Sequence, residues 1–243
     1  MTAASPIDAP GTGETAWCRW PGLRRRPVLD VASWSSAVIL AAHPDDEVLG
    51  AGGMISLLAA AGARLRLIAV TDGEASHPGG DSPALARRRA RERADALRVL
   101  GASAAEVVRL GLPDASLEGR DGGIAAAIGE LAAGFDVCLA PWERDVHADH
   151  EAVGRAARRV ATQVFWYPVW MWHWAAPADQ RVPWRRAVRV LLPPAVADRK
   201  RAAVRCFRSQ LEPRPTGAGP VLPDGFVDHF TRGYELLLRA GPR

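Results

Sequence analysis

Short apolar runs alternate with longer segments of helical periodicity along most of the chain. The apolar runs lie at residues 37–42, 65–71, 106–111 and 135–141, and the helical segments at 48–62, 82–101, 124–133 and from Asp149 onward. A buried strand gives a continuous apolar run, whereas a helix that covers a sheet repeats its apolar positions every three or four residues. Four such strand–helix units predict a mostly parallel sheet with helices on both faces, a Rossmann-like α/β sandwich.

The two ends of the chain depart from this alternation. Residues 1–34 are rich in Pro, Gly, Ala and Arg without a sustained period. We therefore predict an irregular N-terminal arm, followed by a single domain over residues 35–243. Near the other end, "GFVDHFTRGYELLL" predicts an amphipathic helix on which His229 has a structural role.

The composition argues against several functional classes. The chain has 243 residues, 48% of them hydrophobic, which is ample for a core. Its net charge is +4, but the arginines are scattered among 27 acidic residues, which favours no nucleic-acid partner. Cys18, Cys138 and Cys206 lack the CxxC spacing of a thiolate metal site. Since neither a secretory apolar segment nor a membrane-length window is found, we expect a soluble cytoplasmic protein.

Metal-ligand side chains follow two of the predicted strands. The stretch "AHPDDEVLGAGG" comes directly after the first strand, and "PWERDVHADH" ends the fourth. The residues that these stretches deliver are His43, Asp45, Asp46, Asp145, His147, Asp149 and His150. Because the carboxyl ends of parallel strands meet at one edge of a sheet, we expect the two groups to lie together. Two imidazoles, one carboxylate and an open position for water are typical of hydrolytic zinc sites.

Each of these residues alone also has a structural interpretation. A His-Pro pair suits a turn, Asp45 or Asp46 suits the cap of the next helix, and Asp149 suits an N-cap before "HEAVGRAA". Three adjacent carboxylates after a buried strand, however, repel one another unless a cation or hydrogen bonds compensate. The combination therefore favours a metal site, but the spacing does not choose between Asp45 and Asp46 as the ligand.

The two motifs together resemble those of the PIG-L (LmbE-like) family of metal-dependent N-deacetylases. That family has A-H-P-D-D-E after a strand and H-x-D-H later, matched here at 42–47 and 147–150. The resemblance extends over roughly residues 37–211. Its supporting matches are "TDGE" at 71–74, an R-x-x-E-x-x-x-A-x-x-x-L-G helix at 89–101, "LPD" at 112–114 and "SQ" at 209–210 behind Lys200.

The resemblance implies roles for the matching residues. It makes His43, Asp46 and His150 the zinc ligands, Asp45 the general base and His147 a second catalytic histidine. Some relatives have a tyrosine at the position of Asp145, so we expect the groups that stabilise the oxyanion to be arranged differently here. Asp145 or Asp149 is expected to orient His147 through its other ring nitrogen. Contacts with ligands or substrate are further implied for Glu74, Arg89 and Asp114.

The implied activity is the zinc-dependent removal of an N-acetyl or N-acyl group from an amino sugar, such as N-acetylglucosamine, or from its conjugate. Zinc lowers the pKa of a bound water from 15.7 to about 7, which provides a nucleophile at neutral pH. Another divalent ion such as Fe²⁺ is an alternative, because two histidines and a carboxylate also form the site of non-haem iron oxygenases. A metal-dependent sugar-binding module is a second alternative, although a binder needs no base such as Asp45.

The segment "FWYPVWMWHWAAP" is unusually rich in tryptophan. Trp170, Trp172 and Trp174 alternate as one face of a strand would. The rings either bury core or a subunit interface, or form a flat wall for a sugar ring or an apolar acyl group. Trp170 and Trp172 are the candidates for substrate contact in the second case.

Overall fold

The computed structural model describes residues 6–7, 9–80, 82–214 and 217–241. Within these residues the chain forms a seven-stranded sheet in the order β3-β2-β1-β4-β5-β7-β6. The strands are β1 (Ser36–Ala41), β2 (Arg64–Ala69), β3 (Glu106–Arg109), β4 (Val137–Pro141), β5 (Val164–Tyr167), β6 (Ala187–Leu191) and β7 (Tyr234–Arg239). Strands β1 to β5 are parallel, and β7 runs antiparallel to both of its neighbours. The predicted mostly parallel α/β sandwich is therefore confirmed.

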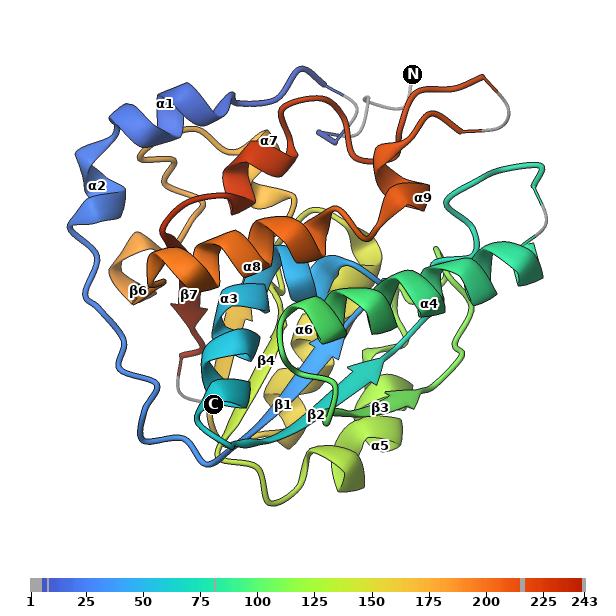
Figure 1. Cartoon of the computed structure of the whole chain (residues 1–243), viewed down its shortest axis with the longest axis horizontal. Coiled ribbons are helices and arrows are strands. Elements are labelled where there is room, and N and C mark those ends of the chain that lie inside the picture. Colours follow the sequence, from blue (N-terminus) through green and yellow to red (C-terminus); the bar gives the residue numbers. More distant parts are fainter. Residues whose placement is uncertain (1–5, 8, 81, 215–216, 242–243) are drawn as a thin grey trace.

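Helices cover both faces of this sheet. One layer holds α3 (Asp46–Ala60), α4 (Ser82–Val99) and α8 (Pro194–Val204), which lie in front of the strands in Figure 1. Helix α8 contacts both α3 and α4. The other holds α5 (Asp121–Ala132) and α6 (Ala148–Val160), which pack together, with α6 against β1, β4 and β5. The order of the strands explains why the helices lie on two faces. The connections from β1 to β3 and those from β3 to β5 cross the sheet in opposite directions. Because such crossovers are right-handed, their helices lie on opposite faces.

The central strands and the helices approach closely. Every residue of β1 and β4 is buried, as expected for parallel strands covered on both faces. A Cβ atom on Gly50 of α3 would lie 2.1 Å from the ring of Tyr167, and one on Gly154 of α6 would lie 2.5 Å from the carbonyl oxygen of Pro141. Glycine at these two positions therefore lets both helices lie nearer the sheet than a larger residue permits.

The sheet order places the two sequence motifs side by side. Strand β1 pairs with β2 on one side and with β4 on the other. The chain leaves β1 for α3 on one face and leaves β4 for α6 on the opposite face. Such a divergence opens a crevice at the carboxyl ends of the two strands, the usual ligand site of open α/β sheets. The loops 42–45 and 142–147 border this crevice.

Two predictions for the C-terminal third are wrong. The first is the strand predicted to carry the tryptophans. Strand β5 ends at Tyr167, because Pro168 has no N–H to continue the sheet. Trp170, Trp172 and Trp174 lie on and around the single turn α7 (Met171–Trp174) instead. The three rings consequently share no strand face. The second is the C-terminal helix, whose residues form a 3₁₀ turn at Val227–Phe230 followed by strand β7. The prediction failed because periodicity does not distinguish the short apolar run of a buried strand from a buried helix.

The N-terminal arm has more structure than its composition predicts. Residues 1–34 include two short helices, α1 (Glu14–Arg19) and α2 (Pro21–Arg24). Trp17 of α1 is fully buried against Trp172. The boundary at residue 34 between arm and domain stays a prediction. None of the helices in the described part of the chain is long and apolar enough to cross a membrane.

Candidate metal and catalytic site

A cleft with about 640 Å³ of empty space, part of it open to solvent, lies at the carboxyl ends of β1 and β4. The predicted site residues that line it are His43, Asp45, Asp46, Arg89, Asp114, His147, His150 and Trp170. Leu49, Ala75, Ser76, Ala115, Val169, Gln210, Val221 and Leu222 complete its walls. Segments more than a hundred residues apart thus meet at the edge that the sequence indicated.

The three residues expected to be ligands converge on one point. Nδ1 of His43 lies 3.3 Å from Nε2 of His150 and 3.4 Å from Oδ2 of Asp46, and Nε2 of His150 lies 3.2 Å from Oδ1 of Asp46. Around a tetrahedral zinc ion with bonds of about 2.0–2.2 Å, adjacent ligand atoms are about 3.3–3.6 Å apart. The donor types and their spacing therefore fit a divalent metal ion.

Asp145 orients the His150 ring. Its Oδ2 lies 2.8 Å from Nδ1 of His150, and the carboxylate is completely buried. The Nδ1–H therefore donates to Asp145, and the lone pair of Nε2 faces the convergence point. Burial alone would lower the pKa of His150, but Asp46 and Asp145 raise it to about 9, so an ion that binds Nε2 must displace a proton.

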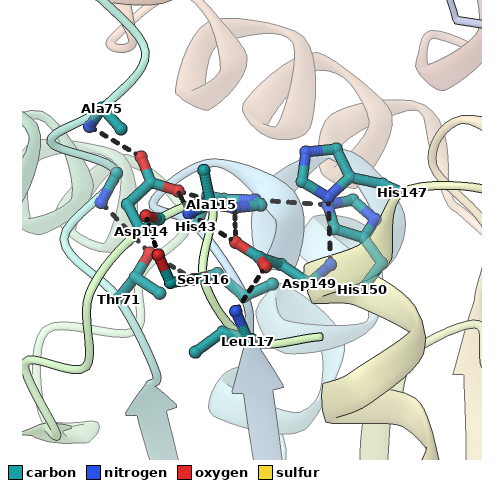
Figure 2. Close-up of polar contacts among 12 residues, drawn as sticks. His43, Thr71, Ala75, Asp114, Ala115, Ser116, Leu117, His147, Asp149 and His150 are labelled. Atoms are coloured by element: carbon teal, nitrogen blue, oxygen red, sulfur yellow. Dashed lines mark hydrogen bonds and ion pairs between the residues drawn. The ribbon is translucent and has the colours of Figure 1, made fainter. Parts of the chain in front are cut away.

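Two carboxylates hold the opposite edge of the His43 ring. Nε2 of His43 lies 3.1 Å from Oδ1 of Asp114 and 3.2 Å from Oδ2 of Asp149, as Figure 2 shows. Asp149 in turn accepts hydrogen bonds from the backbone N–H groups of Ala115 and Leu117, at 2.8 and 3.0 Å. A proton on Nε2 leaves the lone pair on Nδ1, toward the other ligand atoms. Burial opposes the charge on His43, but its hydrogen bonds with these carboxylates raise its pKa well above the usual value, so an ion that binds Nδ1 must displace a proton.

The adjacent residues Asp45 and Asp46 have opposite electrostatic properties. Burial raises the pKa of Asp45 to about 7, and the negative charge of Asp46 adds to this effect while Arg89 opposes it. Asp46 is equally buried, yet the nearby His150 and His43 hold its pKa well below the usual value. One carboxylate is thus fixed in its ionised form, and its neighbour exchanges a proton near neutral pH.

The backbone around Asp45 is strained and held by buried partners. Asp45 has φ of 134°, a region that residues other than glycine rarely adopt. Arg89, which is 2% exposed, donates from Nη2 to the carbonyl oxygen of Pro44 at 2.7 Å, and the same nitrogen lies 3.4 Å from Oδ2 of Asp45. The backbone N–H of Asp45 donates to Glu47 at 3.2 Å. Arg89 and Glu47 therefore fix the direction in which the Asp45 carboxyl points.

His147 precedes α6 as its N-cap residue. Its Nδ1 accepts the backbone N–H of Asp149 at 3.3 Å, so in the neutral ring the proton lies on Nε2. Burial and the neighbouring charges of His150 and His43 lower the pKa of His147 to about 3, which keeps the ring neutral. The contact expected at the other ring nitrogen of His147 comes from the backbone N–H of Asp149, whereas the carboxylates of Asp149 and Asp145 bind His43 and His150.

His147 also lies within reach of the predicted metal position. One nitrogen from each of His43, His147 and His150 lies within 4.8 Å of the others. A second group of three with the same spacing consists of His43, Asp114 and Asp149, on the Nε2 side of His43. Since Asp149 already accepts two backbone N–H groups, this second group is better suited to orienting His43 than to binding an ion.

The remaining predicted residues lie around the cleft. Glu74 accepts the backbone N–H of Asp114 at 2.9 Å and so helps to place that carboxylate. Trp170 faces the cleft, with its ring centroid 4.8 Å from that of Phe226. Trp172 is buried against Trp17 instead, and among the described residues it does not line this cleft.

Sequence reasoning missed the apolar side of the cleft. Leu49, Val169, Val221 and Leu222 line it together with Trp170. No periodicity connects these positions, since they come from a helix and two loops. Gln210, part of the "SQ" match, is fully buried at the cleft, and its Oε1 has no hydrogen-bond partner among the described residues.

Comparison of the sequence with known families and curated proteins gives one match. The model of the PIG-L family, described as GlcNAc-PI de-N-acetylase, matches residues 38–161, half of the chain. These residues include both sequence motifs and the three ligands that they predict. No curated protein matches the chain.

Known structures share the fold at low identity. N,N'-diacetylchitobiose deacetylase from Pyrococcus horikoshii is 19% identical with a TM-score of 0.58, and 84% of this chain and 81% of that one are covered. The zinc-inhibited form of teicoplanin deacetylase Orf2 is 17% identical with a TM-score of 0.61, covering 84% and 98%. GalB, the 4-carboxy-2-hydroxymuconate hydratase from Pseudomonas putida KT2440, is 17% identical with a TM-score of 0.61, covering 86% and 97%. Since this fold carries more than one reaction, the function must be argued from the site.

Proposed function

The chain belongs to the PIG-L family of GlcNAc-PI de-N-acetylases, and from this membership we propose that it is a metal-dependent hydrolase that removes the N-acetyl group of an amino sugar or amino-sugar conjugate. The observation that carries the proposal is the pairing of a convergent His–Asp–His donor set with a second buried carboxyl, Asp45, that lines the same cleft. A binding module needs the first feature alone. Hydrolysis of an amide needs both, because water must lose a proton as it attacks.

We propose His43, Asp46 and His150 as the ligands of the ion, with Zn²⁺ as its identity and Fe²⁺ as the alternative. When bound, a divalent ion supplies a positive charge that lowers the pKa of water and stabilises negative charge on the carbonyl oxygen. The spacing of the three ligand atoms and the fixed orientations of both histidine rings support this assignment. Because teicoplanin deacetylase Orf2, which shares the fold, has a form that zinc inhibits, the test below compares Zn²⁺ with Fe²⁺.

Asp45 acts as the general base in this proposal. Its carboxyl lines the cleft beside the donor set, and a pKa of about 7 suits a group that must accept and then release a proton at neutral pH. His147 lines the same cleft and is neutral, with its proton on Nε2. The Nε2–H of His147 donates to the carbonyl oxygen of the substrate amide as that oxygen gains negative charge. Some relatives have a tyrosine at the position of Asp145 that helps to polarise this carbonyl.

In this proposal the Asp45 carboxyl also protonates the departing amine. A neutral His147 whose pKa is about 3 holds no additional proton to give at neutral pH. Asp45, by contrast, carries the proton that it has taken from the attacking water. Its transfer to the amine nitrogen leaves acetate and the free amino sugar, and it returns Asp45 to the ionised form.

The substrate class follows from the walls of the cleft. The aromatic ring of Trp170 lines the cleft together with apolar residues, Val169, Val221 and Leu222, and with the charged groups of the proposed site. A sugar ring has an apolar face that packs on an aromatic side chain and hydroxyl groups that bind polar ones. We therefore propose that Trp170 packs against the sugar of a small-molecule substrate. We further propose that the protein has no nucleic-acid partner and that it acts in the cytoplasm, as expected from its sequence.

The proposal is tested by metal analysis followed by product release. The purified protein is depleted of metal, reloaded with Zn²⁺, Fe²⁺ or no ion, and incubated with a panel of N-acetylated amino sugars and their conjugates. Acetate release that requires a divalent ion and is lost in Asp45→Asn supports the deacetylase. A metal-loaded protein that binds these sugars without releasing acetate would identify a binding module instead.

An oxygen-dependent reaction is distinguished in the same assay. A non-haem iron oxygenase consumes O₂ and requires Fe²⁺, so its turnover stops under anaerobic conditions. A hydrolase takes only water and proceeds equally with and without O₂. Activity that disappears without oxygen would exclude the proposed function.

A further inference from the structure

The Asp145 carboxylate is held by three consecutive backbone N–H groups at the start of α7. The N–H of Trp170 donates to Oδ2 at 2.9 Å and that of Met171 donates to Oδ1 at 2.8 Å, while the N–H of Val169 lies 3.2 and 3.3 Å from the two oxygens. In addition, Nε1 of Trp174 donates to the carbonyl oxygen of Asp145 at 3.2 Å. The position of α7 therefore determines the position of the group that orients His150.

Helix α7 has only four residues, so its own hydrogen bonds do not hold it in place. Its position depends on the segments that pack against it. The N-terminal arm provides such contacts. Nε1 of Trp17 donates to the carbonyl oxygen of Trp172 at 2.9 Å, and the two rings pack edge to face with centroids 5.1 Å apart.

A second part of the arm binds the next residue of α7. The backbone N–H of Thr12 donates to the carbonyl oxygen of His173 at 2.8 Å. In return, Nε2 of His173 donates to the carbonyl oxygen of Ala9 at 2.8 Å. Two residues of a single turn are thus bound by three hydrogen bonds from a segment that precedes the whole α/β domain.

The arm is itself fixed to the C-terminal part of the chain. Glu14 lies 2.7 Å from Nδ1 of His229 and accepts the Nε–H of Arg232 at 2.6 Å. The Arg232 guanidinium also lies over the Trp172 ring, 4.0 Å from its centre. The arm, α7 and the segment 229–232 therefore form one packed unit beside the cleft.

We propose that the N-terminal arm is a positioning element of the metal site, in which Trp17 holds α7, α7 holds Asp145, and Asp145 fixes the ring of His150. The inference rests on the proposed metal site but on no particular substrate. A histidine ligand whose partner carboxylate moves loses its defined tautomer and direction, which typically weakens metal binding 10- to 100-fold. Trp17 contributes to this arrangement through both a hydrogen bond and ring packing.

The test measures Zn²⁺ affinity of the metal-depleted protein by competition with a chromophoric chelator, together with the visible spectrum of the Co²⁺-substituted protein. Trp17→Ala is expected to weaken Zn²⁺ binding about 10- to 100-fold and to change the Co²⁺ spectrum. Trp34→Ala is the matched control, since Trp34 is also buried but packs on Phe165 at the amino end of β1, away from the cleft. This control is expected to lower the melting temperature without changing either metal readout.

A double-mutant cycle identifies the route of the effect. Asp145→Asn alone should weaken Zn²⁺ binding, and Trp17→Ala added to it should weaken binding no further, because the arm acts through Asp145. If Trp17→Ala fails to fold, Glu14→Gln is tested in its place. Its control is Glu106→Gln, because Glu106 pairs with Arg66 at the far edge of the sheet. Parental Zn²⁺ affinity in the arm variant, or equal weakening in its control, overturns the inference. A parent that binds no Zn²⁺ or other divalent ion would instead contradict the proposed metal site.

Discussion

Nη2 of Arg89 lies 3.4 Å from Oδ2 of Asp45, and both side chains are buried beside the cleft. The guanidinium stabilises the ionised carboxylate, while burial favours the protonated form. These opposing effects leave the pKa of Asp45 at about 7 and not at the extreme that burial alone would produce. Arg89 thus both holds the strained loop and adjusts the acidity of the proposed base.

Asp45→Asn tests the role of this base. The amide keeps the size of the side chain but accepts no proton from water at neutral pH. The variant is expected to fold, to retain stoichiometric metal and to bind substrate, with kcat lowered by about 10²–10⁴, the usual contribution of a positioned acid or base. Single-turnover acetate release together with elemental analysis measures both quantities. Turnover at the parental rate would remove Asp45 from the chemistry.

Asp46→Asn is the matched comparison, because the substitution is the same and the position differs by one residue. Asp46 lies 3.2 Å from Nε2 of His150 and 3.4 Å from Nδ1 of His43. An anionic ligand becomes a neutral amide, so metal content should fall below stoichiometric after dialysis. If this variant keeps its metal and Asp45→Asn loses it, the roles of the two aspartates are reversed.

The three histidines should separate into two classes. His43→Ala and His150→Ala each remove a proposed ligand and should yield protein depleted of metal. His147→Ala should keep the metal and lower kcat by about 10²–10³, as expected for the loss of one hydrogen-bond donor to an oxyanion. Elemental analysis of all three variants after the same dialysis is the measurement. A metal-free His147→Ala would instead favour the alternative group of three histidines.

Much of the fold, and the meeting of the two motifs at one edge of the sheet, could be predicted, because both depend on local signals. Buried parallel strands give continuous apolar runs, and the carboxyl ends of β1 and β4 then bring "HPDD" and "HADH" together. The choice between Asp45 and Asp46 was not predictable from spacing. It depends on the backbone at Asp45, whose φ of 134° turns adjacent carboxyl groups toward different partners.

The partners of the ligands were less predictable, because they come from loops that no periodicity aligns. His43 is held by Asp114, which lies in the loop after β3, and His150 is held by Asp145 through amides of the segment before α7. Asp145 consequently binds His150, while Asp149 reaches His147 with its backbone N–H and His43 with its carboxylate. Sequence proximity on one loop does not determine which ring a carboxylate reaches.

Trp170 and Trp172 should respond differently to truncation. Trp170 lines the cleft, so Trp170→Ala should raise KM severalfold while the melting temperature changes little. Trp172 is 3% exposed and packs against Trp17, so Trp172→Ala should lower the free energy of unfolding by roughly 3–5 kcal/mol. Steady-state kinetics and a thermal melt on each variant separate the two effects. Unchanged KM in Trp170→Ala would contradict its proposed packing against the sugar.

Glu14 should make stability depend on pH in the acid range. Burial opposes its ionisation, but hydrogen bonds with His229 and Arg232 lower its pKa from 4.5 to about 2. Because the folded protein binds this proton less readily than the unfolded chain, the contribution of Glu14 is complete above pH 4.5 and is lost as the pH falls toward 2. Glu14→Gln should therefore destabilise the protein at pH 7, and the difference from the parent should shrink steadily below pH 4.5. Urea unfolding of both proteins across this range is the measurement, and a difference that stays constant with pH would show that Glu14 does not stabilise the fold through its charge.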